Sequence, residues 1–170
     1  MNERNLGKGH ALLTGLTHAL NAGYTHAVTL DADSQHNPQF IKLLLMQNPE
    51  ISLVYGFRNF SCTMPIHRRC SNIISSWIIS VLIGNKVLDS QCGFRRYHLE
   101  KVLKHTYNEL GFQFESEVLI KLGIQGESFH RVQISTLYSN EKSAINNLTD
   151  TFKFIRLIFK FFLIKLKSIT

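Results

Sequence analysis

The apolar positions at the start of the chain predict an amphipathic helix followed by a buried strand. Leucines recur at every fourth residue within the segment 9–21, which gives the single apolar stripe of a helix that packs on a core. Gly23 favours the end of that helix. The segment 27–30 is short, apolar and partly β-branched, and it leads directly into Asp31 and Asp33. We therefore expect two carboxylates at the carboxyl end of a strand.

The same reading predicts an alternation of strands and helices over the rest of the chain. Asn37 followed by Pro38 is typical of a helix start, and the helix is expected to run to about residue 47 before a strand at 51–55. Further on, the pattern predicts loops over 56–69 and 89–96, helices over 71–84, 99–105 and 114–122, and a strand over 129–137. A strand, helix, strand order favours the α/β class, in which ligands gather beyond the carboxyl ends of the strands.

The last segment of the chain is both strongly apolar and basic. In FKFIRLIFKFFLIKLK the basic residues Lys153, Arg156, Lys160 and Lys167 are spaced 3, 4 and 7 apart, which places them on one helical face. Apart from Lys165, phenylalanine, isoleucine and leucine fill the other positions. Such a helix either completes the core of the domain or lies in the plane of an anionic membrane surface, and we favour the membrane.

Composition and charge narrow the class of protein. With 44% apolar and 18% charged residues, the chain of 170 residues is too hydrophobic to be disordered and fits one compact unit. The balance of 19 basic against 12 acidic residues gives 19 − 12 = +7, which indicates anionic partners. A basic face interleaved with aromatic residues is not predicted for the sheet, so nucleic acid is not an expected partner.

Two further features bear on where the protein acts. The three cysteines are an odd number without CxxC spacing, which fits a reducing cytosol better than a disulfide framework. The longest nearly uncharged stretch, residues 70–85, is shorter than the ~20 residues that a bilayer span needs.

The segment DADSQH, residues 31–36, is the strongest candidate for chemistry. Asp31 and Asp33 lie two residues apart at a strand end, and carboxylates this close are commonly relieved by a divalent cation. Mg²⁺ or Mn²⁺ prefers oxygen ligands, so Gln35 is expected to add a side-chain oxygen and a nucleotide diphosphate to complete the shell. An isolated DxD is more often a solvated turn rich in aspartate and serine, so the motif alone is a weak signal.

Several other segments fall into a known order around this motif. NLGKGHAL (5–12), the strand with DADSQHNP (28–38), YGFRNF (55–60), DSQCGFRRY (89–97) and FQFESEVLIK (112–121) together span most of residues 5–121. In this order the chain resembles a family 2 glycosyltransferase of the GT-A fold, similar to the dolichyl- or polyprenyl-phosphate mannose and glucose synthases. The resemblance implies a partial GT-A, Rossmann-like mixed sheet with flanking helices in residues 1–147, followed by a C-terminal amphipathic helix in residues 148–170.

The resemblance also implies roles on the donor side. Asp31 and Asp33 match the DxD motif that binds the metal and the phosphates of the sugar nucleotide, and Gln35 matches a metal-side glutamine. Lys8, between two glycines, resembles a family feature near the donor.

On the acceptor side, Arg58 and Arg69 resemble the basic residues that hold the lipid phosphate. Asp89 begins the motif that lines the acceptor, and Arg95 within that motif is expected to face phosphate. Because a phosphate acceptor is already anionic, arginines that position it matter more than a general base. Glu115 and Glu117 lie two apart and diverge on a helix, which favours a structural or capping role.

These implications give a leading hypothesis and two alternatives. We expect a metal-dependent, inverting glycosyltransferase that moves a sugar from a nucleotide-sugar donor to a polyprenyl-phosphate or other membrane-linked acceptor. It is expected to be cytoplasmic and peripheral at the inner face of the membrane. One alternative is a non-catalytic remnant that acts as a membrane-surface or interaction module, and the other is a transferase for a soluble or polysaccharide acceptor.

One family feature has no counterpart in this sequence. The family normally begins with a strand of the type VVIPAYNE and a DDGS-like segment, so Met1 resembles an internal start. Without that unit, the strand at residues 28–30 is expected to have an unpaired edge and an exposed apolar groove beside it.

Overall fold

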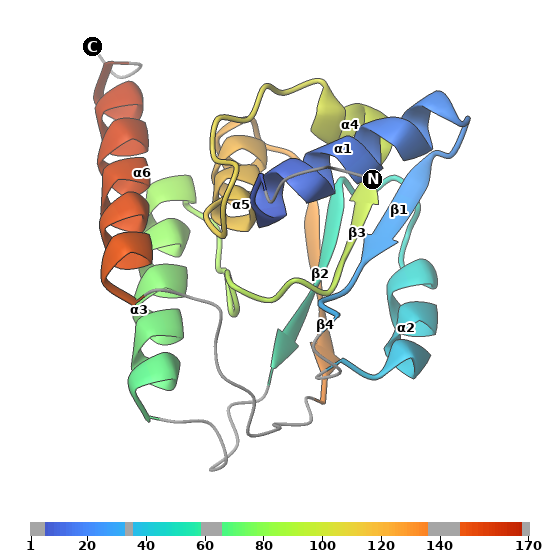
Figure 1. The fold of residues 1–170 in the computed structure, drawn as a ribbon, viewed down its shortest axis with the longest axis horizontal. Helices are drawn as coiled ribbons and strands as arrows, with labels where there is room; N and C mark the ends of the chain where they lie inside the picture. Colours follow the sequence, from blue (N-terminus) through green and yellow to red (C-terminus); the bar gives the residue numbers. More distant parts are fainter. Residues whose placement is uncertain (1–5, 33–35, 59–65, 136–146, 168–170) are drawn as a thin grey trace.

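A four-stranded mixed sheet with helices on both faces forms the centre of the protein (Figure 1). The computed structural model describes residues 6–32, 36–58, 66–135 and 147–167. Its strands are β1 (His26–Thr29), β2 (Leu53–Arg58), β3 (Arg95–His98) and β4 (Phe129–Ile134), in the sheet order β1-β3-β2-β4. β3 runs antiparallel to β1 and β2, and β2 pairs with β4 in parallel. The expected α/β class with a mixed sheet is confirmed.

The helices begin and end close to where the sequence predicts them. They are α1 (Lys8–Asn21), the short 3₁₀ helix η1 (Pro38–Phe40), α2 (Ile41–Leu45), α3 (Ile66–Ile83), α4 (Leu99–Leu103), α5 (Phe114–Ile124) and α6 (Asn147–Lys167). The side chain of Asn37 accepts a hydrogen bond from the amide of Gln39, as expected of an N-cap. Gly23, just after α1, has a φ of 86°, a conformation that favours glycine.

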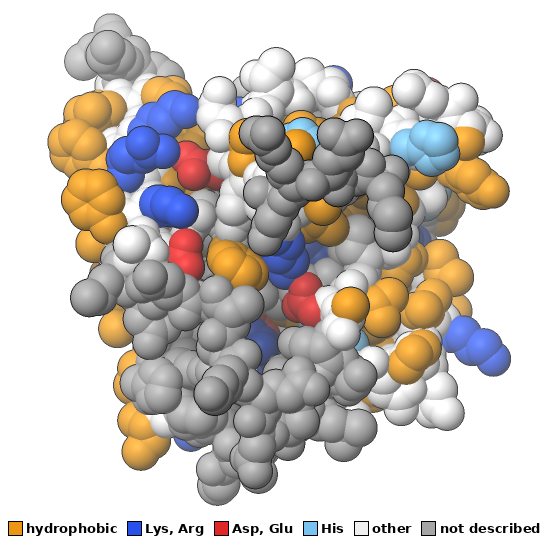
Figure 2. All heavy atoms as spheres, in the orientation of Figure 1, with side chains coloured by type: hydrophobic (Ala, Val, Ile, Leu, Met, Phe, Trp, Pro, Cys, Tyr) orange, Lys and Arg blue, Asp and Glu red, His pale blue; other side chains and the backbone are white. Residues whose placement is uncertain are grey.

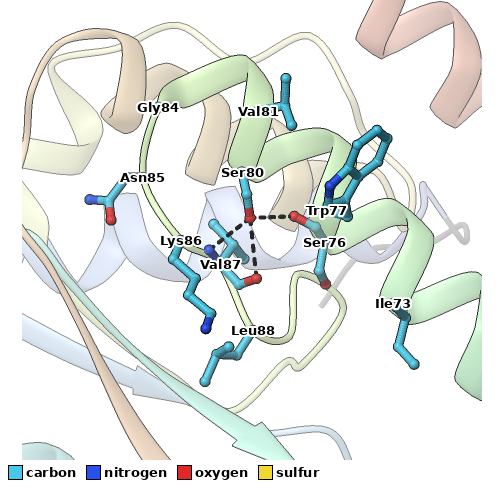
Figure 3. A pocket seen from close by; sticks show the side chains of 10 residues that line it. All are labelled: Ile73, Ser76, Trp77, Ser80, Val81, Gly84, Asn85, Lys86, Val87 and Leu88. Carbon is cyan, nitrogen blue, oxygen red and sulfur yellow. Dashed lines mark hydrogen bonds between the residues drawn. The ribbon is translucent and has the colours of Figure 1, made fainter.

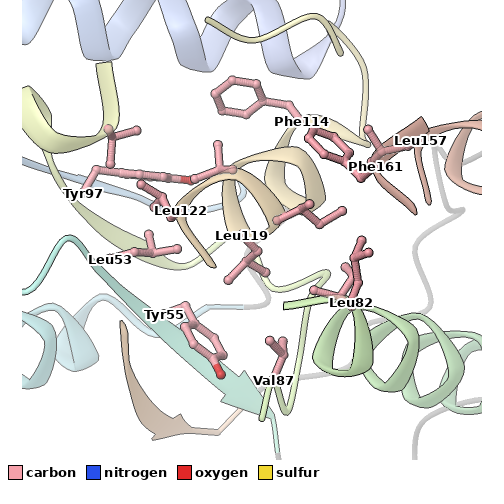
Figure 4. Close-up of a cluster of buried hydrophobic side chains, with 14 of the residues drawn as sticks. Leu53, Tyr55, Leu82, Val87, Tyr97, Phe114, Leu119, Leu122, Leu157 and Phe161 are labelled. Atoms are coloured by element: carbon pink, nitrogen blue, oxygen red, sulfur yellow. The ribbon is translucent and has the colours of Figure 1, made fainter. Parts of the chain in front are cut away.

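Alternating side chains of the strands form two apolar cores, one on each face of the sheet. Leu53 and Tyr55 of β2 and Tyr97 of β3 pack with α1, α3, α5 and α6 on one face (Figure 4). Val54 of β2 and Phe94 pack with α2 on the other face. Because helices cover both faces, the strand ends are the part of the sheet that a ligand can reach.

β3 begins inside the segment 89–96, which is expected to be a loop, and for Arg95 and Arg96 this expectation is wrong. The strand begins with two arginines, a residue type that is rarely buried unless its donors are paired. The guanidinium of Arg96 donates to the carbonyls of Leu44, Gln47 and Asn48 at 3.1, 2.8 and 2.6 Å. These carbonyls lie at and just beyond the end of α2, so Arg96 serves as a side-chain cap that joins α2 to the sheet.

β1 forms one edge of the sheet, as the sequence predicts. It pairs with β3 on one side, and within the described ranges no strand lies on its other side. Leu30, immediately after the strand, is exposed. The unpaired edge is thus confirmed, while the apolar groove beside it stays a prediction.

α6 packs one face on the domain and exposes the other. Leu157 and Phe161 are only 1% and 4% exposed and belong to the core, and Nζ of Lys165 donates to the carbonyl of Leu82 in α3 at 2.6 Å. The outward face carries exposed apolar side chains, namely Phe152, Ile155, Phe159, Phe162, Leu163 and Leu166. Figure 2 shows hydrophobic side chains along the edge of the molecule where α6 lies, with lysine and arginine side chains beside them. Among the described helices, none is both long and apolar enough to cross a bilayer.

The packing of α6 predicts that the helix unfolds together with the rest of the domain. We expect Leu157→Ala to lower the free energy of unfolding by about 2–5 kcal/mol, because it leaves a cavity in the core. Leu163→Ala is the matched control: this leucine on the same helix is 43% exposed, and its loss should change stability by no more than about 0.5 kcal/mol. Urea unfolding followed by far-ultraviolet circular dichroism measures both. Equal effects of the two substitutions would show that α6 is not docked.

Candidate functional site

Three charged side chains from distant parts of the chain meet beyond the carboxyl end of β1. Nζ of Lys8 lies 2.6 Å from Oδ1 of Asp31 and 3.0 Å from Oε1 of Glu115. Lys8 is the first residue of α1, Asp31 follows β1, and Glu115 lies in the first turn of α5. We call these residues the Asp31 cluster.

The glycines on either side of Lys8 explain how α1 reaches this position. Gly7 has a φ of 98°, and a Cβ there would collide with the carbonyl of Leu110. A Cβ at Gly9 would lie 2.6 Å from Cβ of Phe114. The start of α1 therefore packs directly against the segment that leads into α5, and this contact places Lys8 over Glu115.

The carboxylate of Asp31 packs against the backbone of a glycine in a neighbouring loop. Residues 89–94, which we call the 89–94 loop, precede β3. Oγ1 of Thr29 donates to the carbonyl of Gly93 at 2.9 Å, and a Cβ at Gly93 would lie 2.5 Å from both carboxylate oxygens of Asp31. Glycine at position 93 thus leaves the space that the Asp31 carboxylate fills.

The Asp31 cluster keeps Lys8 positively charged. Burial acts to lower the pKa of Lys8, but attraction to Glu115 and then to Asp31 outweighs burial, so the net effect is a raised pKa. Two carboxylates and one ammonium leave a local formal charge of −2 + 1 = −1. An additional cation is therefore attracted to this position.

A second cluster lies at the other end of the 89–94 loop. Asp89 is fully buried and accepts hydrogen bonds from Nε and Nη2 of Arg58 at 2.7 and 3.1 Å and from Nδ2 of Asn72 at 2.7 Å. The backbone amides of Arg58 and Gln91 donate to the same carboxylate. We call Arg58, Asn72 and Asp89 the Asp89 cluster; its bidentate ion pair fixes the plane of the Arg58 guanidinium at the end of β2.

Arg95 connects the two clusters through hydrogen bonds inside the protein. Its guanidinium donates to the carbonyls of Ser90, Cys92 and Glu115, each at 2.8 Å, and the residue is fully buried. The guanidinium that the sequence analysis expects to face phosphate therefore lies inside the protein, between the 89–94 loop and α5. Its contacts support both clusters by holding the loop against the helix that carries Glu115.

The structure brings together some of the predicted residues and adds one that the sequence analysis missed. Lys8 meets Asp31, and Arg58 meets Asp89, whereas Arg69 lies exposed on α3. Asp33 and Gln35 lie outside the described residues.

Glu115 is the member of the Asp31 cluster that the sequence analysis missed. A structural role was expected for both glutamates, and it fits Glu117. The carboxylate of Glu117 accepts hydrogen bonds from the backbone amides of Asn108 and Glu109. The signal for Glu115 was its charge in the first turn of a mostly apolar helix.

Asp31 has the chemistry of a ligand for a hard divalent cation. Its carboxylate offers oxygen donors, and the ammonium of Lys8 already lies against it. Within the described ranges, no group of three or more histidine, cysteine, aspartate or glutamate side chains is arranged to hold a metal ion. A metal at Asp31 would thus require further oxygens, and the predicted ligands Asp33 and Gln35 are of that type.

The close approach at Gly93 gives a prediction about stability. We expect Gly93→Ala to lower the free energy of unfolding by about 1–3 kcal/mol, because the new methyl group must push the Asp31 carboxylate away from Lys8. Gly15→Ala is the control, since that glycine lies inside α1 with open space around it, and it should raise stability by about 0.5–1 kcal/mol. Thermal or urea unfolding measures both, and a stabilising effect at position 93 would contradict this geometry.

Comparisons of the sequence show relatives that are longer than this chain. It is 31% identical over 152 residues to the UDP-N-acetylglucosamine–dolichyl-phosphate N-acetylglucosaminyltransferase of Methanococcus voltae, a match that covers 84% of this chain and 60% of the relative. It is 27% identical over 170 residues to an uncharacterized protein of Methanocaldococcus jannaschii, covering 95% of this chain and 69% of that protein. No protein-family model matches the chain. The chain thus spans about three fifths of the first of these relatives.

Comparisons of the structure show a known architecture. Glucosyl-3-phosphoglycerate synthase from Mycobacterium tuberculosis in complex with UDP superposes with a TM-score of 0.68 at 18% identity, covering 95% of this chain and 56% of that protein. The same enzyme in complex with Mn²⁺ and UDP-glucose gives a TM-score of 0.63 at 20% identity, covering 96% and 55%. With the sequence similarity to the archaeal transferase, these likenesses show that the chain has a GT-A-like α/β fold, the fold of the mycobacterial synthase.

Proposed function

We propose that the protein is a metal-dependent glycosyltransferase, which transfers a sugar from a nucleotide-sugar donor to a polyprenyl phosphate or another membrane-linked acceptor. The observation that carries the proposal is the placement of the Asp31 and Asp89 clusters at opposite ends of one loop, beyond the ends of β1 and β2. Two relationships support the proposal. The archaeal relative is named for a dolichyl-phosphate acceptor, and the structure of the mycobacterial enzyme was solved with Mn²⁺ and UDP-glucose.

The Asp31 cluster suits the donor. Transfer breaks the bond between the anomeric carbon and the diphosphate oxygen, so negative charge grows on the departing diphosphate. Mg²⁺ or Mn²⁺, when held by Asp31 with the predicted ligands Asp33 and Gln35, would supply positive charge for that diphosphate. Lys8 adds a second positive charge at the same place, where burial strengthens its effect.

The Asp89 cluster suits an anionic acceptor. Asp89 holds the Arg58 guanidinium by two hydrogen bonds, which presents a rigid donor plane for phosphate. Since both oxygens of Asp89 already accept hydrogen bonds, its proposed part in catalysis is to orient Arg58. Arg69, exposed on α3, is the second proposed phosphate contact. A phosphate oxygen is anionic at neutral pH, so the reaction needs no general base on this side.

An apolar hollow along α3 suits the hydrocarbon part of a lipid acceptor (Figure 3). Its volume is about 560 Å³, and its lining includes Ile73, Trp77, Val81, Val87 and Leu88. Ser76 at its inner side donates to Asn72, which in turn donates to Asp89. The hollow thus adjoins the proposed phosphate position.

The outward face of α6 suits a membrane surface that carries such an acceptor. Its exposed phenylalanines and leucines lie beside the basic residues Lys153, Arg156 and Lys160, a combination that binds anionic headgroups and inserts apolar side chains between them. We propose that residues 148–170 hold the domain, residues 1–147, at the cytoplasmic face of a membrane. A non-catalytic module that binds membranes through the same helix is the second candidate, favoured by the exposed apolar side chains of α6.

The catalytic proposal predicts a metal-dependent transfer that requires Asp31. With UDP-N-acetylglucosamine and a short polyprenyl phosphate, we expect labelled sugar to enter the lipid fraction in the presence of Mg²⁺ or Mn²⁺ and not with EDTA. Asp31→Asn should lower the rate by about 100-fold or more, because it removes charge that holds the metal and diphosphate. Glu50→Gln, at an exposed carboxylate, is the control and should leave the rate unchanged. Transfer that survives both EDTA and Asp31→Asn would refute the metal-dependent mechanism, and absence of transfer would favour the non-catalytic module.

The membrane proposal predicts salt-sensitive binding to anionic vesicles. Removing Lys153 and Lys160 by a double substitution to glutamine should weaken binding by about 2 kcal/mol, roughly 30-fold, since each basic residue near an anionic surface contributes about 1 kcal/mol. The double substitution of Lys101 and Lys104 to glutamine, in α4 and directly after it, removes the same charge elsewhere. Co-sedimentation with phosphatidylserine vesicles measures both, and an equal loss for the two doubles would show that net charge, not α6, drives binding.

A further inference from the structure

We propose that Lys8 is a built-in counter-cation which occupies the Asp31 carboxylate until a divalent cation binds there, and which then remains with Glu115. The inference rests on the proposed metal-binding role of Asp31. It assigns to Lys8 a control of metal affinity that the donor-side role alone does not include.

The two carboxylates of the Asp31 cluster differ in how strongly they need Lys8. The side chain of Glu115 is only 4% exposed, and a buried carboxylate without a nearby positive charge is strongly destabilising. The side chain of Asp31 is 27% exposed, so water or an ion can take the place of the ammonium there. The contact with Asp31 is therefore the exchangeable one, and the contact with Glu115 is the anchor.

A metal ion and Lys8 compete for the same oxygen. Nζ of Lys8 lies 2.6 Å from Oδ1 of Asp31, closer than its distance of 3.0 Å to Glu115. A divalent cation on that oxygen would stand next to the ammonium, and two positive charges at such a separation repel each other. Backbone of Gly93 packs against the carboxylate, so Asp31 cannot turn far to separate them.

The surroundings of Lys8 provide a place for the released ammonium. Nζ lies 5.9 Å from the centre of the Phe112 ring, within the range of a cation–π contact, and Glu115 remains on the same side. The backbone of Lys8 is fixed by the close packing of Gly7 and Gly9. Only the flexible side chain has to move, from Asp31 toward Glu115 and the ring.

A charge-neutral double substitution separates competition from simple electrostatics. Lys8→Met with Glu115→Gln removes one positive and one negative charge, so the local formal charge stays at −1, and no buried carboxylate is left unpaired. If Lys8 occupies Oδ1 of Asp31, the double variant should bind Mn²⁺ about fivefold more tightly than the wild-type protein. Binding is measured from the loss of the free Mn²⁺ signal in electron paramagnetic resonance.

Two controls locate the effect. Asp31→Asn must abolish the tighter site, which assigns it to this carboxylate. The double substitution Lys101→Met with Glu50→Gln removes an exposed ion pair that has the same 3.0 Å separation as Lys8 and Glu115, and it should leave Mn²⁺ affinity unchanged. Equal Mn²⁺ affinity in the unchanged chain and the Lys8/Glu115 double variant would overturn the inference about Lys8 and leave the metal site standing. Absence of any Mn²⁺ site sensitive to Asp31→Asn would overturn the metal proposal as well.

The release of Lys8 has a direct chemical readout in the unchanged chain. An ammonium held by two carboxylates reacts slowly with acetic anhydride, and Mg²⁺ at saturating concentration should increase the acetylation rate of Lys8 severalfold. Mass spectrometry of the digested protein measures the rate at Lys8 and, as an internal reference, at exposed Lys86. A rate at Lys8 that Mg²⁺ does not change, while Mn²⁺ binding at Asp31 is intact, would contradict the proposed release.

Discussion

The buried guanidinium of Arg95 is the interaction on which the site depends. A fully buried positive charge is costly unless each of its donors is satisfied, and here three backbone carbonyls accept from it at 2.8 Å. Two of these carbonyls belong to the 89–94 loop and one belongs to Glu115. The loop therefore cannot shift without breaking charge-assisted hydrogen bonds inside the protein, and its two ends, Asp89 and Gly93, stay fixed relative to α5.

The mixed sheet explains why residues so far apart in the sequence meet at one edge. β3 runs antiparallel between β1 and β2, so those two strands end on the side where β3 begins. Thr29 and Tyr55 both stand opposite Arg95 in the register. Asp31 and Arg58, which lie at or just beyond the ends of β1 and β2, are thereby separated by the start of β3 and the loop that precedes it. An antiparallel strand in this position thus brings the Asp31 cluster and the Asp89 cluster to opposite ends of the same loop.

The sequence predicted the elements whose hydrophobic periodicity is clear. It missed β3, in which the buried side chains are charged. The leucine repeat of α1 and the apolar run of β1 gave nearly correct bounds because their side chains face a core. β3 was missed because it opens with two arginines, and only the tertiary structure supplies the carbonyls that bury them. α6 was assigned to a membrane surface, yet Leu157 and Phe161 show that one of its faces also completes the core. Hydrophobic periodicity identifies an apolar face but does not say whether protein or lipid covers it.

The candidate site shows the same limit at the level of single residues. The DxD motif was found because two carboxylates follow a predicted strand, and the 89–94 segment because it belongs to the order of segments that resembles the family, whereas Glu115 lay in a mostly apolar helix and was assigned a structural role. Its partnership with Lys8 depends on the close packing of α1 against the segment before α5, which involves residues more than a hundred positions apart. Spacing along the chain carries no information about such a contact.

The two aspartates of the site differ in burial, and this difference separates their proposed roles. Asp89 is inaccessible to water, and its oxygens accept from a guanidinium, an amide side chain and two backbone amides, so any exchange of partner would leave several donors unsatisfied. Asp31 is partly exposed and is held by one flexible lysine against the backbone of a glycine. A carboxylate that must give up one partner for a metal or a substrate needs the second environment, and a carboxylate that must hold an arginine in a fixed plane needs the first. The fold provides both environments at the two ends of the 89–94 loop, because the buried Arg95 guanidinium holds that loop in place.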